Sequence, residues 1–279
     1  MNKTQGVEIY KRMHFIRNFE YAVQVAHKSG FIYVPIYLSV GQESIAATLS
    51  VFFEGMTIPI FAQHRAHSYF LAFGGSPDKL KNSLISKEDS WDLGAAGSAS
   101  ISDANIKMFG HSGFMGDQVP IAAGYALVNE YPAISVVGDA SAEEDYVLAT
   151  LGFIANRDIP LLLVCEDNNF SILTPKSVRR NWNLKEVSKS FGCESHDIND
   201  SPTEIWSILQ TWDMQSSLVL NINTTRHLWH AGSGQDATPT NDTLVNFKEY
   251  LKKTFIDVNL EEIESVNEVL VKEIWNDAV

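Results

Sequence analysis

The feature that most constrains the fold is a pair of short apolar runs with a helix-length segment between them. The runs are Ile134–Val137 and Leu161–Cys165, and roughly 18 residues that separate them fit one helix. Such a strand–helix–strand unit implies a parallel sheet with a right-handed crossover. Leu218–Ile222 is a third candidate strand, and a helix is predicted before it, around Pro202–Trp212. We therefore predict an α/β fold in which helices cover both faces of a parallel sheet.

The remaining sequence predicts helical flanks around this sheet. Residues 6–29 carry apolar side chains at close to helical spacing, and a second helical pattern runs through Glu43–Phe53. Residues 74–112 are polar and glycine-rich, which predicts loops with room for one short helix. Leu260–Val279 reads as an acidic amphipathic helix with a solvated face and one buried stripe. Because no repeat or linker divides the sequence, we expect residues 1–279 to form one domain.

Composition and charge exclude several classes of protein. The 279 residues include 21 Lys plus Arg and 34 Asp plus Glu, a net charge of −13 that repels nucleic-acid backbones. No apolar run approaches the roughly 18 residues that span a bilayer, and the start of the sequence has no signal-peptide core. The cysteines, Cys165 and Cys193, are too few for a disulfide scaffold or a cysteine-rich zinc site. We expect an acidic, cytoplasmic protein that binds neither nucleic acid nor membrane.

Both central strands are followed at once by acidic and amide side chains. Asp139 comes directly after the first strand, and Glu166–Asn169 come after the second. In open parallel sheets, ligands bind at the carboxyl ends of the strands, and neighbouring strands lie ~5 Å apart. A carboxylate and a carboxamide at these positions can therefore converge on one cation, and Mg²⁺ prefers such oxygen ligands.

The segment after Asp139 predicts an anion site beside that cation. Its small residues open a helix, so the N–H groups of Ala140 and Ser141 would face an anion that shares the metal. A simpler interpretation is also open, in which Asp139 only caps the helix and Asn168 and Asn169 only form a turn.

Several motifs in order along the sequence resemble a known enzyme family. The dipeptide GD, 28 intervening residues and then Asn168 resemble the thiamine diphosphate motif. VGQESIAATLSVFF, QHRAHSYFLAFGG, GFMGDQVPIAAGYALV and RDIPLLLVCEDNN are similar, in that order, to the alpha subunit of the first component of 2-oxo acid dehydrogenases. Pyruvate, branched-chain 2-oxo acid and acetoin dehydrogenases belong to this family. The resemblance runs from about residue 6 to the tail and implies a parallel-sheet thiamine diphosphate-binding fold.

This resemblance implies roles for particular residues. The metal ligands would be Asp139, Asn168 and the backbone carbonyl of Phe170. His230 and His67 match the family's histidines and would be catalytic. The residues expected to bind the cofactor are His64, Arg65, Gly113, Met115, Gly138, Ala140, Ser141, Asn168 and His230.

The resemblance also implies a reaction and a partner. Thiamine diphosphate and Mg²⁺ would support cleavage of a 2-oxo acid, with the acyl unit passed to an acceptor such as a lipoyl domain. In the family, the glutamate that activates the cofactor comes from a separate beta subunit. We therefore expect half of an active site here, completed in an α₂β₂ heterotetramer.

One departure from the family lies at the diphosphate. The run GDASAEED places Glu143 where the family has an Asn that donates to the diphosphate. Like charges ~4 Å apart cost on the order of 4 kcal/mol near a protein surface. Glu143 therefore points away, is protonated, or weakens cofactor binding, and our hypothesis is that it points away.

Two further departures lie toward the substrate. Tyr37, before GQE, and Ser100, in GSAS, stand where the family has histidines. These changes leave two alternatives open besides a 2-oxo acid dehydrogenase subunit. One is a transketolase-like carboligase that moves a two-carbon unit from a ketose donor onto an aldehyde or sugar. The other is a catalytically silent binding subunit.

Overall fold

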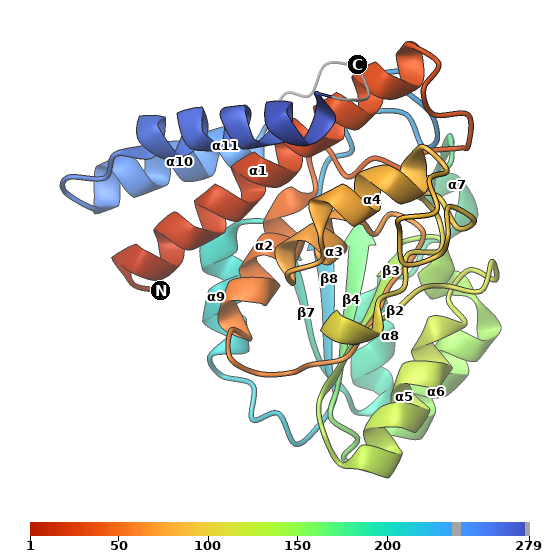
Figure 1. The fold of residues 1–279 in the computed structure, drawn as a ribbon. Coiled ribbons are helices and arrows are strands. Elements are labelled where there is room, and N and C mark those ends of the chain that lie inside the picture. The colour runs from red at the N-terminus through yellow and green to blue at the C-terminus, as the bar shows by residue number, and fades with distance from the viewer. Residues whose placement is uncertain (236–240, 277–279) are drawn as a thin grey trace.

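A six-stranded parallel sheet forms the centre of residues 1–235 and 241–276, which are the residues that the computed structural model describes. The strands lie in the order β2-β1-β3-β4-β8-β7, and each neighbouring pair is parallel (Figure 1). Their bounds are β1 Ile60–Phe61, β2 Met108–Phe109, β3 Ala133–Gly138, β4 Leu161–Asp167, β7 Glu194–Asn199 and β8 Leu218–Asn223. The strands β5 Phe170–Ser171 and β6 Thr174–Pro175 form a separate antiparallel hairpin.

Helices cover both faces of the sheet because its buried side chains alternate between two cores. Ile134 and Val136 of β3 pack into one core, whereas Ala133 and Val137 pack into the other. The first core includes side chains of α1, α2, α3, α4, α9 and α11, and the second includes those of α5, α6 and α8. The bounds are α1 Lys3–Lys28, α2 Glu43–Phe52, α3 His67–Ala72, α4 Pro77–Leu84, α5 Gln118–Asn129, α6 Asp145–Ala155, α7 Lys176–Arg179, α8 Leu184–Phe191, α9 Pro202–Leu209, α10 Thr243–Thr254 and α11 Leu260–Trp275.

The predicted α/β class and the three predicted strands are confirmed, as are the predicted helices α1, α2 and α9. Strands β1, β2 and β7 were not predicted. The first two are only two residues long, and β7 has the polar sequence ESHDIN. In the loop-rich stretch 74–112, α4 is the short helix for which the sequence left room.

The segment between β3 and β4 differs from the prediction at its start. The helix was expected to open at Ala140 and Ser141, but residues Ser141–Glu143 form a 3₁₀ turn and α6 begins at Asp145. Glu144 separates the two because its backbone is extended, with φ −65° and ψ 141°. Asp139 caps neither helix, since the N-cap residues are Ala140 and Glu144.

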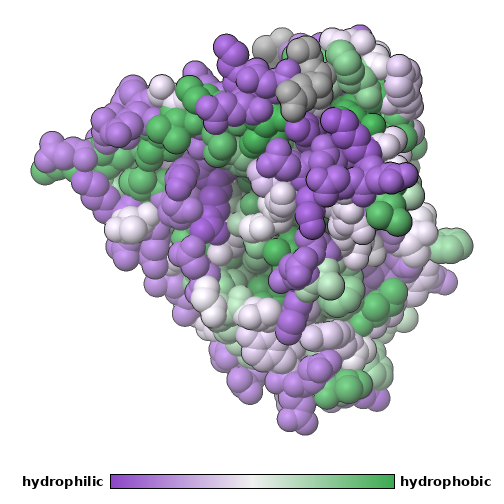
Figure 2. Space-filling model, viewed as in Figure 1, coloured by the Kyte–Doolittle hydropathy of each residue, from purple (hydrophilic) through white to green (hydrophobic). Residues whose placement is uncertain are grey.

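The helices α10 and α11 lie along α1 at one end of the molecule (Figure 1). In α11, Val271, Ile274 and Trp275 are buried, but Val266 and Val269 are more than half exposed. The outward face of this predicted amphipathic helix is therefore partly apolar. Figure 2 shows a hydrophobic band along the part of the molecule formed by α10 and α11. The part of the expected helix over residues 277–279 lies outside the described residues. No helix in the described part of the chain is long and apolar enough to cross a bilayer.

Candidate functional site

A cavity of about 300 Å³ opens at the carboxyl ends of the central strands. Register explains its position, since Gly138, the last residue of β3, pairs with Glu166, one residue before the end of β4. The cavity is lined by Gln63, His64, Arg65, Met115, Gly138, Asp139, Ala140, Ser141, Glu144, Asn168, Phe170, Ser171, Ile172 and His230. Every cofactor-binding and metal-binding residue expected from the sequence is in this set except Gly113.

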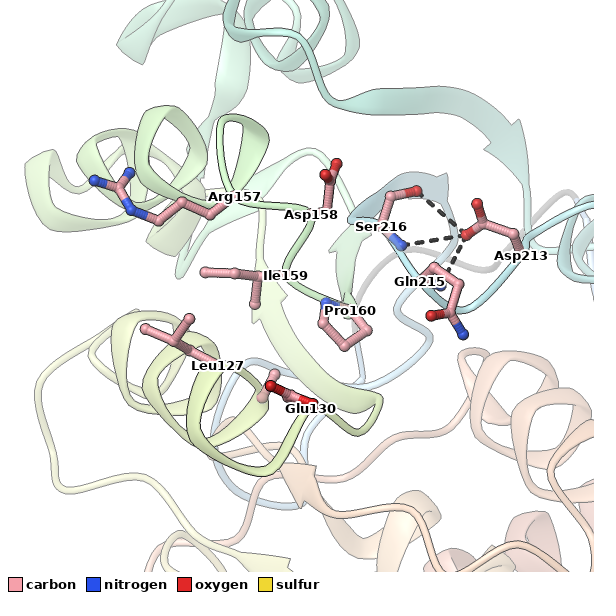
Figure 3. A pocket seen from close by; sticks show the side chains of 10 residues that line it. Leu127, Glu130, Arg157, Asp158, Ile159, Pro160, Asp213, Gln215 and Ser216 are labelled. Atoms are coloured by element: carbon pink, nitrogen blue, oxygen red, sulfur yellow. Dashed lines mark hydrogen bonds between the residues drawn. The ribbon is translucent and has the colours of Figure 1, made fainter.

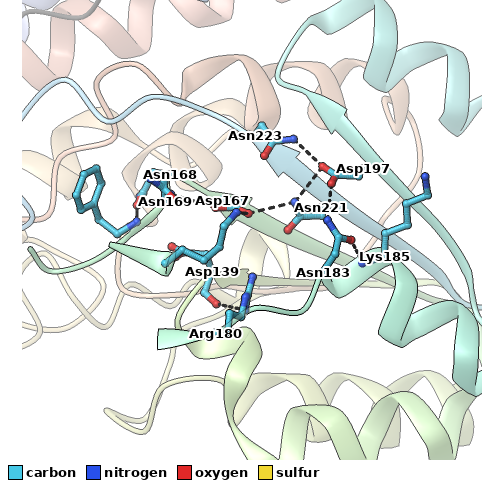
Figure 4. A network of polar contacts seen from close by, with 12 residues as sticks. Asp139, Asp167, Asn168, Asn169, Arg180, Asn183, Lys185, Asp197, Asn221 and Asn223 are labelled. Atoms are coloured by element: carbon cyan, nitrogen blue, oxygen red, sulfur yellow. Dashed lines mark hydrogen bonds and ion pairs between the residues drawn. The ribbon is translucent and has the colours of Figure 1, made fainter. Parts of the chain in front are cut away.

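Two arginines meet the predicted metal ligand Asp139 at the end of β3. Its side chain is almost wholly buried and accepts a hydrogen bond from Arg179, while Arg180 donates to its backbone oxygen at 2.9 Å (Figure 4). Burial, followed by the charge of Asp167, raises the pKa of Asp139. A cation at this carboxylate would relieve that unfavourable burial, and in the ligand-free chain the Arg179 guanidinium supplies the positive charge.

Asp167 belongs to β4 rather than to the loop after it, which corrects the prediction for both Glu166 and Asp167. The Asp167 carboxylate pairs with Lys176 and accepts a hydrogen bond from Asn221 of β8 at 3.2 Å. Asn221 also donates to Asp197 of β7, so the network crosses three strands (Figure 4). Asp167 is therefore engaged in holding the strand ends together and does not line the cavity.

Asn168 is oriented by the GQE loop. Its side-chain Nδ2 donates to Gln42 Oε1 at 3.3 Å, and its Oδ1 accepts from the Phe170 backbone N–H at 3.2 Å. Gln42 in turn donates to Glu166 at 3.2 Å. The amide oxygen of Asn168 thus keeps a lone pair for a cation. Asn169 forms the turn that the simpler interpretation expected, with a φ of +68°.

Glu166 is a fully buried carboxyl beneath the cavity. It accepts hydrogen bonds from the Tyr69 hydroxyl at 2.8 Å and from the amides of Gln42 and Gln63. Burial raises the pKa of Glu166 to about 7. Since Gln63 lines the cavity and Gln42 holds Asn168, this carboxyl fixes two side chains that surround the site.

Arg65 and a group of aromatic rings form the opposite wall of the cavity. Arg65 donates to the backbone oxygens of Leu38 at 2.6 Å and His230 at 3.1 Å. The Tyr37 ring meets His64 edge-on at 4.9 Å between centroids and His230 at 5.6 Å. Tyr37 therefore supports two imidazoles that line the cavity.

The imidazole of His64 is neutral, so one ring nitrogen can donate a hydrogen bond and the other can accept one. Burial, followed by the charge of Arg65, lowers the pKa of His64 to about 2. Neither ring nitrogen has a hydrogen-bond partner within the described residues. Because an unsatisfied buried polar group costs about 1–3 kcal/mol, both nitrogens are suited to a polar ligand.

His111 is a residue that the sequence interpretation missed. Its ring lies 6.0 Å from that of His64, and burial lowers its pKa. The Gly113 N–H donates to His111 Nδ1 at 2.9 Å, and Ser100 donates to its backbone oxygen at 3.4 Å. The sequence carried a signal in GHSG, which we interpreted only as a loop. His111 stands near the place where Ser100 replaces a family histidine.

His67 and Gly113 do not line the cavity. His67 is fully buried, with its ring nitrogens 2.9 Å from Glu20 and 2.8 Å from the Ser98 hydroxyl. Ser98 also accepts from the Tyr37 backbone N–H at 2.9 Å. His67 therefore supports the wall that carries Tyr37, and the geometry lends no support to a direct catalytic role.

Glu143 does not line the cavity, whereas its neighbour Glu144 does. Glu143 Oε1 lies 3.4 Å from Arg179 and 3.3 Å from Arg180. The sequence interpretation missed these two arginines because they follow the β5–β6 hairpin, about 40 positions from the carboxylates they meet.

A second cavity, of about 450 Å³, lies at the opposite end of the sheet, where Pro160 precedes β4 and Ser216 precedes β8 (Figure 3). Its Asp213 carboxylate accepts from the backbone N–H groups of Gln215 and Ser216 at 2.8 and 3.2 Å. That acid is therefore committed to its own turn. Across residues 1–235 and 241–276, no cluster of three or more His, Cys, Asp or Glu side chains is placed to hold a metal. A metal would need amide and carbonyl ligands, as the first cavity offers.

Comparisons with known proteins agree with this arrangement. The dehydrogenase E1 component family matches residues 11–195. The alpha subunit of the pyruvate dehydrogenase E1 component of Zymomonas mobilis is 28% identical over 199 residues, covering 68% of this chain and 56% of that protein. The corresponding subunit of Rickettsia bellii is 23% identical over 298 residues, covering 99% of this chain and 90% of that protein.

Solved structures show the same fold. Transketolase from Campylobacter jejuni aligns with a TM-score of 0.63 at 16% identity, over 99% of this chain and 49% of that chain. Transketolase from Leishmania mexicana gives a TM-score of 0.62 at 13% identity, over 97% of this chain and 45% of that chain. The chain spans about half the length of these transketolases and of the Zymomonas relative.

Proposed function

Because this chain belongs to the dehydrogenase E1 component family, we propose that it is the alpha subunit of a two-chain, thiamine diphosphate-dependent enzyme that cleaves a 2-oxo acid. The acyl unit then passes to an acceptor, with a lipoyl domain as the first candidate. One observation carries the proposal. The residues expected at the diphosphate and metal come together in one cavity from four separate parts of the sequence.

The cofactor's diphosphate would be held by Arg65, His64 and His230 on one wall and by the turn at Ala140 and Ser141 on the other. The guanidinium fork of Arg65 suits phosphate oxygens. When bound, thiamine diphosphate supplies a carbon nucleophile and an electron sink for breaking a carbon–carbon bond. His64 enters this reaction neutral, so it can donate one hydrogen bond without adding charge.

A magnesium ion fits the donor set at the ends of β3 and β4. Asp139 offers a buried carboxylate, Asn168 an oriented amide oxygen, and Phe170 a backbone carbonyl. These are oxygen ligands of the kind Mg²⁺ prefers, and phosphate and water would complete its shell.

We propose a beta subunit as the partner, in an α₂β₂ assembly. The only carboxylates that line the cavity are Asp139 and Glu144, in the part of the chain that the structure describes. Asp139 is assigned to the metal, and the family resemblance assigns the activating glutamate to a separate beta subunit, so we expect that glutamate from outside this chain. Apolar side chains near the cavity support a protein partner there, since Phe114, Ile172 and Leu173 are 73%, 57% and 72% exposed. We expect the assembly to act in the cytoplasm, because both cysteines are free and buried.

The first test is whether the complex binds the cofactor through Asp139. The tagged chain is purified with whatever accompanies it, its mass is measured under native conditions, and thiamine diphosphate with Mg²⁺ is titrated by calorimetry. We expect a heterotetramer, and we expect Asp139→Ala to weaken binding by on the order of 100-fold. The matched control is Asp213→Ala, at the opposite end of the sheet, which should leave binding unchanged. Equal binding by Asp139→Ala would contradict the proposal.

The second test identifies the acceptor. Reductive acylation of a lipoyl domain by the loaded complex is the expected result for a 2-oxo acid dehydrogenase. Aldehyde-dependent carbon–carbon bond formation would instead favour a transketolase-like carboligase. Tyr37 and Ser100, the two departures toward the substrate, are the reason for testing this alternative. Failure of the purified complex to bind cofactor would favour the silent subunit.

A further inference from the structure

One basic side chain contacts the carboxylate at which a cation is expected, and a second contacts the backbone of the same residue. Arg179 donates to the Asp139 carboxylate. Arg180 donates to the Asp139 backbone oxygen at 2.9 Å, as Figure 4 shows. Both arginine side chains are largely buried, with 13% and 3% of their surface exposed. The same Asp139 carboxylate would bind both the Arg179 guanidinium and a divalent cation. A divalent cation that binds there therefore competes with Arg179.

The alternative partner for Arg179 is already in place. Glu143 Oε1 lies 3.4 Å from the same Arg179 nitrogen that contacts Asp139. This oxygen is buried and accepts no hydrogen bond from the described residues, and Arg179 Nε and Nη1 likewise have no acceptor there. Burial without a hydrogen-bond partner is unfavourable for each of these groups. A small shift of Arg179 from Asp139 to Glu143 would therefore satisfy groups that the ligand-free arrangement leaves unsatisfied.

Arg180 keeps Glu143 in position for this exchange. Its Nη1 lies 3.3 Å from Glu143 Oε1. Its guanidinium stacks on the Trp182 ring, with the guanidinium carbon 4.3 Å from the ring centroid. Stacking and burial restrict the Arg180 side chain, so its contact with Glu143 does not depend on whether Asp139 holds a metal.

We propose that Arg179 is an exchangeable counter-cation, which neutralises Asp139 in the ligand-free protein and transfers to Glu143 when a divalent cation binds Asp139. Glu143 is then a positioning residue that receives the displaced guanidinium, and an acid at this position assists cofactor binding. The inference rests on the proposed function, because it concerns binding of Mg²⁺ and thiamine diphosphate at the same cavity.

Calorimetric titration of Mg²⁺ with thiamine diphosphate into the purified complex tests the exchange without any activity measurement. We expect Glu143→Gln to weaken binding roughly tenfold, because Arg179 then has no alternative partner and continues to compete for Asp139. The matched control is Glu186→Gln, which removes the same charge from an exposed position of α8. It should bind as tightly as the natural protein.

The decisive variant is the pair Glu143→Gln with Arg179→Gln. Removing the competitor should restore binding to within about threefold of the natural protein, and Arg179→Gln alone should bind at least as tightly. Arg179→Met is a second variant, and circular dichroism verifies that each variant is folded. Tighter binding by Glu143→Gln, weaker binding by both Arg179 variants, or no rescue in the pair would overturn the exchange. Absence of binding by the natural complex would instead overturn the proposed function, and the exchange with it.

Discussion

At the residue scale, the site depends on buried polar groups whose charge is set by their neighbours. Asp139, Glu143 and Asp167 are each matched by a basic side chain from the segment Lys176–Arg180. On the opposite wall, His64 carries no charge because burial and Arg65 disfavour its protonation. A cavity with these properties admits an anion and a cation together without accumulating net charge.

His64 should make stability depend on pH. Since its pKa is lowered to about 2 in the folded protein, the unfolded chain, in which the pKa is ~6.5, binds the extra proton at intermediate pH. This contribution to stability is therefore present above pH ~6.5 and is lost as the pH falls, by about 2 kcal/mol between pH 7 and pH 5. Urea unfolding of the natural protein and of His64→Gln at both pH values measures their free energies of unfolding. Relative to the natural protein, the variant should be more stable at pH 5 than at pH 7.

The control for this prediction is His196→Gln, which removes a partly exposed histidine from β7. Stability should fall less between pH 7 and pH 5 in His64→Gln than in this control, which keeps His64. Equal changes in the two variants would show that His64 is not held neutral by its surroundings.

Residue-level motifs were the part of the site that sequence predicted best. The glycine of the GQE motif is required by the backbone. A Cβ on Gly41 would lie 2.1 Å from the Thr225 backbone oxygen, and the φ of Gly41 is +97°. His111 was missed because its motif GHSG was interpreted only as a loop. Arg179 and Arg180 were missed because no local pattern marks them. Their roles arise only from contacts with residues far away in the sequence.

At the element scale, one buried arginine joins three helices. Arg17 of α1 donates to Glu43 at the start of α2, at 3.0 Å in one of two contacts. It also donates to Asp242, the N-cap of α10, at 2.9 and 3.1 Å. The Glu43 side chain is only 1% exposed, so this carboxylate relies on Arg17 for its counter-charge.

Replacement of Arg17 should be strongly destabilising. We expect Arg17→Met to lower the free energy of unfolding by about 3–5 kcal/mol, because a buried carboxylate is left without a partner. Arg12→Met is the control, since Arg12 pairs with Glu54, which is 63% exposed, and such surface pairs contribute about 0–1 kcal/mol. Denaturant unfolding measures both. If the two variants lose the same stability, the ion pair at Glu43 does not hold these helices together.

Prediction at this scale succeeded where hydrophobic periodicity was strong and failed where elements were short or polar. Strands β3, β4 and β8 are apolar runs buried on both faces, whereas β1 and β2 have two residues each. The start of α6 was placed too early, because small residues after Asp139 suggest a helix but Glu144 adopts an extended backbone.

At the scale of the whole molecule, two of the regions with exposed apolar side chains bear on assembly. One region surrounds the cavity and includes Phe114, Ile172 and Leu173, and the other is the band on α11 that includes Val266 and Val269. The proposed beta subunit must reach the cavity to supply a glutamate. The first region is therefore the surface on which we expect it.

Hydrogen exchange of the complex tests this assignment. In the presence of the beta subunit, amides of residues 112–116 and 170–174 should exchange at least about tenfold more slowly than in the isolated chain. Amides of the loop 156–160, at the opposite end of the sheet, serve as the internal reference and should not change. Protection confined to α11 would place the partner elsewhere and leave the cavity open.

The two edges of the sheet have a consequence for the chain before it meets any partner. One edge is β2, only two residues long, and the other is β7, whose sequence ESHDIN carries the ionisable residues Glu194, His196 and Asp197. Short or charged edge strands resist the addition of strands from other molecules. Newly made copies of this chain are thus protected from pairing with one another edge strand to edge strand, which would lead to aggregates. They can therefore remain separate molecules until they assemble with a partner.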